Sequence, residues 1–186
     1  MNWLHALAAA VLSCVAVAPA RAEADEWALS IGPVYRGLVE PFDTADGEST
    51  IFRSAVGGLV RLRYGVDDFF QIGGSLDAGV GLPNDISPVA PIAAAFFEAH
   101  YVVDIVTWVP YATLGIGGIL RGAAPDDEGT ELHLEPALTL GGGLEYRPAR
   151  EFAVDFAGRY ELVFLHPSLE SLSGFSFALT YTLFFE

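Results

Sequence analysis

The sequence has 186 residues, enough for one domain, and a formal net charge of −15 with nine basic residues, all arginine. This balance excludes a nucleic-acid-binding surface, which needs clustered positive charge. Hydrophobic residues make up 52% of the chain, yet beyond the first 22 residues no apolar run is long enough for a membrane-spanning helix. High hydrophobicity without such a run is typical of alternating strands that face lipid.

Residues 1–22 have the features of a cleaved secretory signal. A short apolar core at 4–17 precedes the small-x-small pattern Ala20-Arg21-Ala22. We therefore expect the folded domain to comprise residues 23–186. The single cysteine, Cys14, would be lost with the signal, leaving no disulfide or thiolate site in the mature chain. The alternative is that Cys14 is the lipidated cysteine of a lipoprotein box.

From Glu23 onward, apolar and polar residues alternate in segments separated by turn-rich stretches. We predict eight strands, at about 26–40, 51–65, 69–82, 92–105, 108–121, 131–147, 152–165 and 173–185. Tight turns alternate with longer connections at 41–50, 83–91, 122–130 and 166–172. This alternation predicts consecutive antiparallel hairpins, with the short turns gathered at one end of the sheet.

Charged residues fall on one side-chain phase in each predicted strand, and the opposite phase is apolar, as in Trp27, Leu29 and Ile31. Successive residues of a strand point to opposite faces, so one face is apolar and the other carries the charges. A charge facing lipid near the midplane would cost about 2–4 kcal/mol. We therefore predict an all-β protein, an eight-stranded antiparallel up-and-down transmembrane β-barrel. The predicted interior polar network comprises Arg36, Arg53, Arg61, Arg63, Asp77, Glu98, His100, Asp104, Arg121, His133, Glu135, Glu145, Arg147, Asp155, Arg159 and Glu161.

The interior of an eight-stranded barrel is just wide enough for side chains to fill. We expect the interior charges to pair as a plug, because unpaired buried charge is costly. A narrow polar path for ions or small solutes is the alternative. His100 and His133 lie two residues from Glu98 and Glu135 and share a face with them. We interpret both as hydrogen-bonded interior histidines, because a metal site needs three or four converging ligands.

Aromatic residues gather near the strand ends on the short-turn side and predict a girdle at the membrane interface. These residues are Trp27, Tyr64, Phe70, Trp108, Tyr146, Phe152 and Phe185. Rim aromatics of a soluble barrel are the alternative. Glycines inside the strands indicate tight curvature of a small closed sheet. Pro33 and Pro136 each remove a hydrogen-bond donor from a strand, and we expect a bulge at each.

Two predicted loops are acidic, and their carboxylates are Glu40, Asp43, Asp46, Glu48, Asp126, Asp127, Glu128 and Glu131. The simpler interpretation is solvated charge. The alternative is that the loops bind divalent cations, which calcium-dependent thermal stability or loop proteolysis would test. His166-Pro167-Ser168 also lies in a predicted loop, but its surroundings match no catalytic constellation that we identify. We therefore assign no catalytic, cofactor-binding or metal residues.

The last predicted strand alternates large apolar residues with small or polar ones. Its apolar positions are Phe175, Phe177, Leu179, Tyr181, Leu183 and Phe185. This stretch resembles the C-terminal assembly signal of bacterial outer-membrane β-barrels, with Glu186 as a departure after the final aromatic residue. In architecture, the chain from about Glu23 to Phe185 resembles small outer-membrane β-barrel proteins of the OmpA/OmpX/OmpW-like class.

This resemblance implies a location in the outer membrane of a Gram-negative bacterium, with outer-membrane lipid and the barrel-assembly machinery as partners. Families of this class include adhesins, structural anchors, small-solute channels and a few lipid-modifying enzymes, so the resemblance implies location more than activity. Because we identify no catalytic constellation, we expect a non-enzymatic protein with a structural or surface-interaction role. Two alternatives follow from the same residues. One is a narrow channel for small solutes. The other is a soluble, lipocalin-like barrel that binds a ligand and turns its apolar face inward.

Overall fold

The computed structural model describes residues 24–44, 47–83, 90–103, 107–122, 132–165 and 171–186. These residues form eight strands, which confirms the predicted all-β fold. The strands are β1 (Trp27–Thr44), β2 (Gly47–Gly65), β3 (Phe70–Gly81), β4 (Pro91–Val102), β5 (Trp108–Gly122), β6 (Leu132–Tyr146), β7 (Phe152–Phe164) and β8 (Ser171–Phe185).

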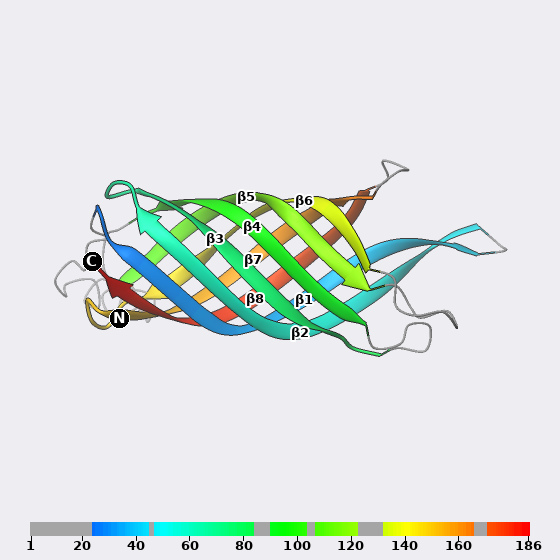
Figure 1. Cartoon of the computed structure of the whole chain (residues 1–186), viewed down its shortest axis with the longest axis horizontal. Coiled ribbons are helices and arrows are strands. Elements are labelled where there is room, and N and C mark those ends of the chain that lie inside the picture. Colours follow the sequence, from blue (N-terminus) through cyan, green and yellow to red (C-terminus); the bar gives the residue numbers. More distant parts are fainter. Residues whose placement is uncertain (1–23, 45–46, 84–89, 104–106, 123–131, 166–170) are drawn as a thin grey trace, which may run out of the picture.

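Each strand pairs antiparallel with the next, and β8 pairs with β1 to close the barrel (Figure 1). At this closure Trp27 lies opposite Phe185 and Ser30 opposite Thr182. We call the end that carries the β2–β3, β4–β5 and β6–β7 connections the turn end, and the opposite end the loop end. The up-and-down antiparallel topology is therefore confirmed.

The first hairpin differs from the prediction. Residues 41–50 were expected to form a loop, but β1 continues to Thr44 and β2 begins at Gly47. The pairing continues in one register to Thr44 and Gly47. In Figure 1 this hairpin projects beyond the other strands at the loop end. Backbone pairing therefore extends both strands through a stretch whose composition is that of a loop.

The side-chain phases match the predicted barrel. Outward residues are apolar and exposed, as at Leu134 (72%) and Ile116 (62%), whereas inward Arg61 and Glu98 have no exposed surface. A soluble barrel would reverse this distribution. The lipocalin-like alternative, which turns the apolar face inward, is therefore wrong. Among the described residues, no helix is long and apolar enough to cross a membrane.

The inward glycines allow the strands to coil tightly. A Cβ atom at Gly57 would lie 2.2 Å from the carbonyl oxygen of Ala78, and one at Gly79 would lie 2.3 Å from that of Val56. Because these two glycines face each other across β2 and β3, neither position has room for a side chain. The expectation that strand glycines serve the curvature of a small closed sheet is consistent with these contacts.

Neither predicted proline bulge is present. On either side of Pro33, Ile31 pairs with Tyr181 and Val34 with Ala178, so no residue is inserted between β1 and β8. The ladder is simply interrupted where the proline has no N–H to donate. Pro136 pairs with Gly118 on the β5 side, and the β6–β7 ladder begins only after it, at Ala137. The barrel therefore accepts both prolines without a change of register.

Candidate functional site: the barrel lumen and its loop-end mouth

Most of the predicted interior residues lie in the lumen with buried side chains. These are Arg36, Arg61, Arg63, Asp77, Glu98, His100, Glu135, Glu145, Arg147, Asp155, Arg159 and Glu161. Arg53 and Arg121 are half-buried near the loop end, and His133 is exposed beside Arg121 in the β5–β6 register. Asp104 lies outside the described residues.

On the loop side of the lumen, Arg36 joins three strands. Its guanidinium binds Asp77 of β3 through two hydrogen bonds of 2.6 and 3.0 Å. It also binds Glu161 of β7 through bonds of 2.8 and 3.1 Å. The hydroxyl of Ser176 donates to the same Glu161 carboxylate at 2.8 Å. One arginine therefore ties β1 to two strands with which it shares no backbone ladder.

At mid-height, Glu98 is the acceptor at the centre of a second cluster. Its carboxylate accepts hydrogen bonds from Arg159 Nη1 at 2.5 Å and from Ser75 Oγ at 2.6 Å. Arg61 Nε lies 3.3 Å away, and His100 Nε2 lies 3.1 Å away. The carboxylate is enclosed by three nitrogen-bearing side chains and a hydroxyl, an arrangement that satisfies a buried charge.

Arg61 extends this cluster to the opposite wall. Its Nη1 lies 3.3 Å from Asp155 Oδ2, and the hydroxyl of Tyr111 donates to the same carboxylate at 3.0 Å. The imidazole of His100 packs near the Tyr111 ring, with the ring centres 5.5 Å apart. The sequence placed Glu98 and His100 together, but Tyr111 was not among the predicted network residues. Tyr111 lies on the inward phase of its strand, and this phase was the feature of the sequence that could have placed it in the network.

Near the turn end, a third cluster spans the lumen from β2 to β6. Arg63 Nη2 donates to Glu145 at 2.8 Å, and its Nη1 donates to Gln71 at 3.1 Å. Arg147 Nε donates to the other Glu145 oxygen at 2.5 Å. The Arg147 guanidinium carbon lies 4.4 Å from the centre of the Phe184 ring, a cation–π contact.

Arginines and carboxylates are equal in number among the ion pairs found in the described part of the lumen. Six arginines make ion pairs with six carboxylates: Arg36, Arg61, Arg63, Arg121, Arg147 and Arg159 with Asp77, Glu98, Glu135, Glu145, Asp155 and Glu161. Apart from Arg121–Glu135 and Arg147–Glu145, each pair joins strands that are not neighbours in the barrel. The network therefore joins opposite walls of the barrel as well as filling its interior.

Apolar side chains complete the filling of the lumen. They were not among the residues predicted for the interior. Toward the loop end, Leu38, Phe96, Ile119, Val163 and Leu172 form one buried cluster. Nearer the turn end, a second cluster includes Val34, Leu59, Val102 and Val109. In the sequence, these large apolar residues lie on the same strand phase as the charged residues, which could have placed them in the lumen. These two clusters and the ion pairs close the described lumen at several levels.

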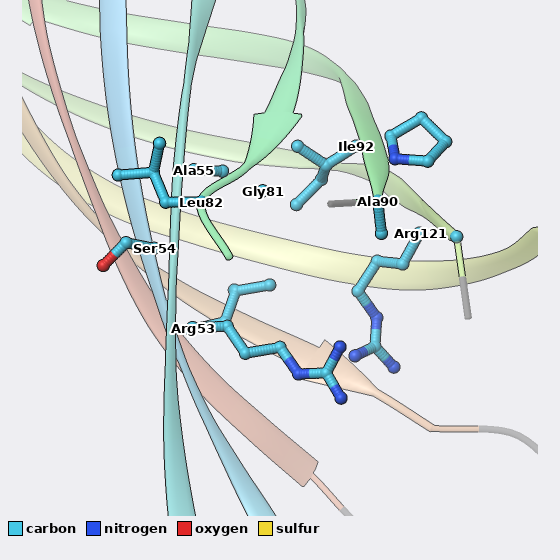
Figure 2. A pocket seen from close by; sticks show the side chains of 11 residues that line it. Arg53, Ser54, Ala55, Gly81, Leu82, Ala90, Ile92 and Arg121 are labelled. Carbon is cyan, nitrogen blue, oxygen red and sulfur yellow. The ribbon is translucent and has the colours of Figure 1, made fainter. Parts of the chain in front are cut away.

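A small pocket lies at the loop-end mouth, above the apolar cluster. Leu38, Ala55 and Ile92 contribute to its apolar lining, and Arg53 and Arg121 contribute its charged groups. Figure 2 shows both guanidinium groups on the same side of the pocket, away from Leu82 and Ile92. Arg121 is held by Glu135 through two hydrogen bonds of 2.7 Å. The pocket volume of about 40 Å³ accommodates a few water molecules, not a drug-sized ligand.

The predicted girdle aromatics lie at the turn end, and four of them contact each other in two pairs. The ring centres of Trp27 and Tyr64 are 4.9 Å apart, and those of Trp108 and Tyr146 are 4.6 Å apart. Phe70 and Phe152 contact Tyr101 and Tyr181 at 5.2 and 5.7 Å. Of the last strand, Phe177, Leu179, Tyr181, Leu183 and Phe185 are exposed on the outer surface, and Phe175 is half-buried.

The loop expectations fall largely outside the described structure. Asp46, Asp126, Asp127, Glu128, Glu131, His166 and Ser168 lie outside the described residues. Glu40, Asp43 and Glu48 belong to the projecting β1–β2 hairpin. Within the described ranges, no group of three or more His, Cys, Asp or Glu side chains could hold a metal ion. The cation hypothesis therefore stays a prediction.

Comparison with known proteins places the fold. No family model and no curated protein matches the sequence. Among solved structures, the chain is similar to Neisserial surface protein A, with a TM-score of 0.66 and 9% identity over 84% of this chain and 96% of that chain. OprG from Pseudomonas aeruginosa matches with a TM-score of 0.61 and 10% identity over 91% and 100% of the two chains.

A third similar structure is Ail, the attachment invasion locus protein of Yersinia pestis. It matches with a TM-score of 0.57 and 18% identity over 87% of this chain and 99% of that chain. Likeness at these identities concerns the fold, and each match spans nearly the whole of the other barrel. The chain therefore has the fold of the small bacterial outer-membrane β-barrels, and its resemblance to the OmpA/OmpX-like class is confirmed at that level.

Proposed function

We propose that this chain is an integral outer-membrane protein with a structural or surface-interaction role, whose lumen is plugged and performs no catalysis. The observation that carries the proposal is the filling of the lumen. Ion pairs join opposite walls at three levels, and two apolar clusters fill further space toward the loop end and nearer the turn end. The apolar exterior supports membrane insertion, because it would be unfavourable in water.

The loop end supports a role outside the membrane. The β1–β2 hairpin projects beyond the other strands there, as Figure 1 shows. The sequence of this hairpin contains Glu40, Asp43, Asp46 and Glu48, so a partner that it meets would need cationic groups or bound cations. A structure of Ail contains a heparin analogue, sucrose octasulfate. A polyanion of that kind does not suit the acidic hairpin of this chain.

A narrow channel is the second candidate, and one observation favours it. Several buried polar atoms in the lumen have no hydrogen-bond partner among the described protein atoms, including Arg61 Nη2, Arg159 Nη2, Thr113 Oγ1 and Thr139 Oγ1. Buried polar groups of this kind are commonly satisfied by ordered water. A lumen that holds ordered water among its polar groups would pass a small solute if the ion pairs between its walls opened.

Two measurements on the full mature protein test these proposals in order. The first is outer-membrane fractionation with SDS gels of unheated and boiled samples. We expect integral association and a heat-dependent shift in mobility, and recovery in the soluble fraction without a shift would overturn the membrane assignment.

The second is single-channel recording in planar bilayers. We expect no regular conductance steps, whereas reproducible steps would replace the plugged barrel with the channel.

A further inference from the structure

The apolar exterior of the barrel is hollowed on one face. Two hollows of about 600 and 500 Å³ lie over β2 to β5. Leu76 and Ala95 line both of them, so they adjoin. The first hollow reaches Trp27 and Tyr64 of the aromatic girdle, and the second reaches Leu120 and Leu134 toward the loop end. Together they form one surface groove along the barrel.

The groove exists because outward residues are small there. Gly58, Ala78 and Ala93 are neighbours in the pairing of β2, β3 and β4. One position along, Ala95 pairs with Gly118 of β5. Elsewhere on the exterior many outward side chains are large, and exposed examples are Leu138, Leu140, Phe156, Tyr160, Phe177 and Leu179.

Two glycines in this groove are not required by the backbone. A Cβ atom at Gly58 would meet nothing within 4 Å, and one at Gly74 would meet only the carbonyl oxygen of Phe96, at 3.4 Å. The inward glycines differ, because a Cβ atom at Gly57 or Gly73 would collide with a carbonyl oxygen at 2.2 or 2.1 Å. Glycine weakens a strand interior, and the backbone does not require it at Gly58 or Gly74. The effect of glycine at these two positions is that the surface groove is deeper there.

A second copy of the chain does not fit this groove well. A two-fold dimer centred on the groove would place hollow against hollow and leave unfilled space. Packing the groove of one copy on large residues elsewhere on the exterior of another would be head-to-tail and would not close. A flexible hydrocarbon chain fills an apolar groove without either problem. Along β3, the outward residues that line the first hollow, Ile72 to Leu76, cover about 13 Å at roughly 3.3 Å per residue, room for part of one acyl chain.

The charges beside the groove indicate the headgroup. The first hollow opens at Trp27 and Tyr64, and the Tyr64 hydroxyl donates to Asp25 Oδ1 at 2.5 Å. Asp68, in the adjoining β2–β3 turn, is exposed. Two carboxylates at this position attract an ammonium group and repel an anionic headgroup.

We propose that the first hollow binds one acyl chain of an amine-bearing zwitterionic phospholipid, phosphatidylethanolamine, from the membrane leaflet at the turn end. The girdle pair Trp27–Tyr64 sets the depth of the headgroup, and Asp25 and Asp68 select its ammonium group. Gly74 and Ala95 provide the space for the chain. This proposal rests on the membrane location proposed above.

The test is native mass spectrometry of the full mature protein released from bilayers with equal phosphatidylethanolamine and phosphatidylglycerol. We expect the protein to retain phosphatidylethanolamine at least fivefold over phosphatidylglycerol. The double variant Gly74→Leu/Ala95→Leu fills the hollow and is expected to lose at least four fifths of the retained lipid. Ala112→Leu adds the same side chain at an exposed outward position that does not line either hollow, and it is expected to retain lipid normally.

A second double variant tests the headgroup separately. Asp25→Asn/Asp68→Asn keeps the hollow and is expected to abolish the preference between the two lipids while lipid is still retained. Equal retention by the filled variant and the native protein would overturn the site, and a preference unchanged by the Asn variant would overturn the headgroup assignment. The heat-dependent gel shift is measured on the same samples. A missing shift would count against the membrane proposal, whereas normal shifts without retained lipid would count against this site alone.

Discussion

The lumen and the exterior of this barrel use alternate residues of the same strands but follow opposite rules. The lumen holds charges of both signs, most of them paired with a residue of another strand. The exterior holds large apolar residues with no specific partners, such as Leu134 and Ile116. Stability inside therefore depends on particular pairs, and stability outside depends on composition. A lumen substitution should be costly because it leaves a buried charge without its partner. An exterior substitution should be costly when it places a charge in hydrocarbon.

The largest effect is expected in the lumen, at Arg36. Arg36→Ala would leave Asp77 and Glu161 buried without their arginine, and we expect a loss of about 3–5 kcal/mol in the free energy of unfolding. Urea titration in lipid vesicles, followed by tryptophan fluorescence, measures it. Arg150→Ala is the control, because Arg150 and Glu186 form an exposed pair at 3.7 Å whose loss should change stability by no more than about 0.5 kcal/mol. Equal losses in the two variants would contradict the distinction.

The next effect concerns the exterior, at Leu140. This residue lies near the middle of β6 and is 62% exposed. Leu140→Arg would place a charge in hydrocarbon, and we expect a loss of about 2–4 kcal/mol in the same titration. Leu140→Phe keeps the position apolar and should change little. If arginine were tolerated as well as phenylalanine, this part of the exterior would not face lipid.

The outward residues could be predicted from the sequence more completely than the contacts within the lumen. Alternation is local, so the outward phase of each strand could be predicted from a few neighbours such as Leu138, Leu140 and Leu144. The partner of Arg36 could not, because Asp77 and Glu161 approach it only after closure fixes the stagger of β3 and β7. Phe96 and Ile119 share the inward phase with charged residues, and an apolar side chain by itself does not show whether it faces lipid or the lumen.

Two other differences have local causes. The 41–50 stretch is polar and has no apolar phase, so its composition resembled a loop although its backbone pairs. The bulges expected at Pro33 and Pro136 are absent because each proline lies where a ladder is interrupted or has not begun. A missing donor is recognisable in a sequence, but the side of the strand on which that donor would be needed depends on the register.

The smallest effect compares glycines of the two faces. A Cβ atom at Gly117 would lie 1.9 Å from the carbonyl oxygen of Ala95, so Gly117→Ala should lose about 1–3 kcal/mol through displaced backbone. Gly58→Ala meets open space and should gain about 0.5 kcal/mol, because alanine restricts the unfolded chain. Thermal unfolding of both variants gives the comparison. A loss at Gly58 as large as that at Gly117 would mean that both glycines serve the backbone.

The pairing of β1 with β8 also has a consequence for the time course of folding. The seam joins the first strand to the last, and the Ser30 and Thr182 hydroxyls, 2.8 Å apart, lie on either side of it. Until β8 arrives, β1 and β7 each present an open edge whose backbone groups would find no partner in hydrocarbon. Contacts of such long sequence separation also form slowly. A chain interrupted before β8 would therefore have no stable membrane-inserted form, and a nascent chain must be kept from aggregating until its last strand is available.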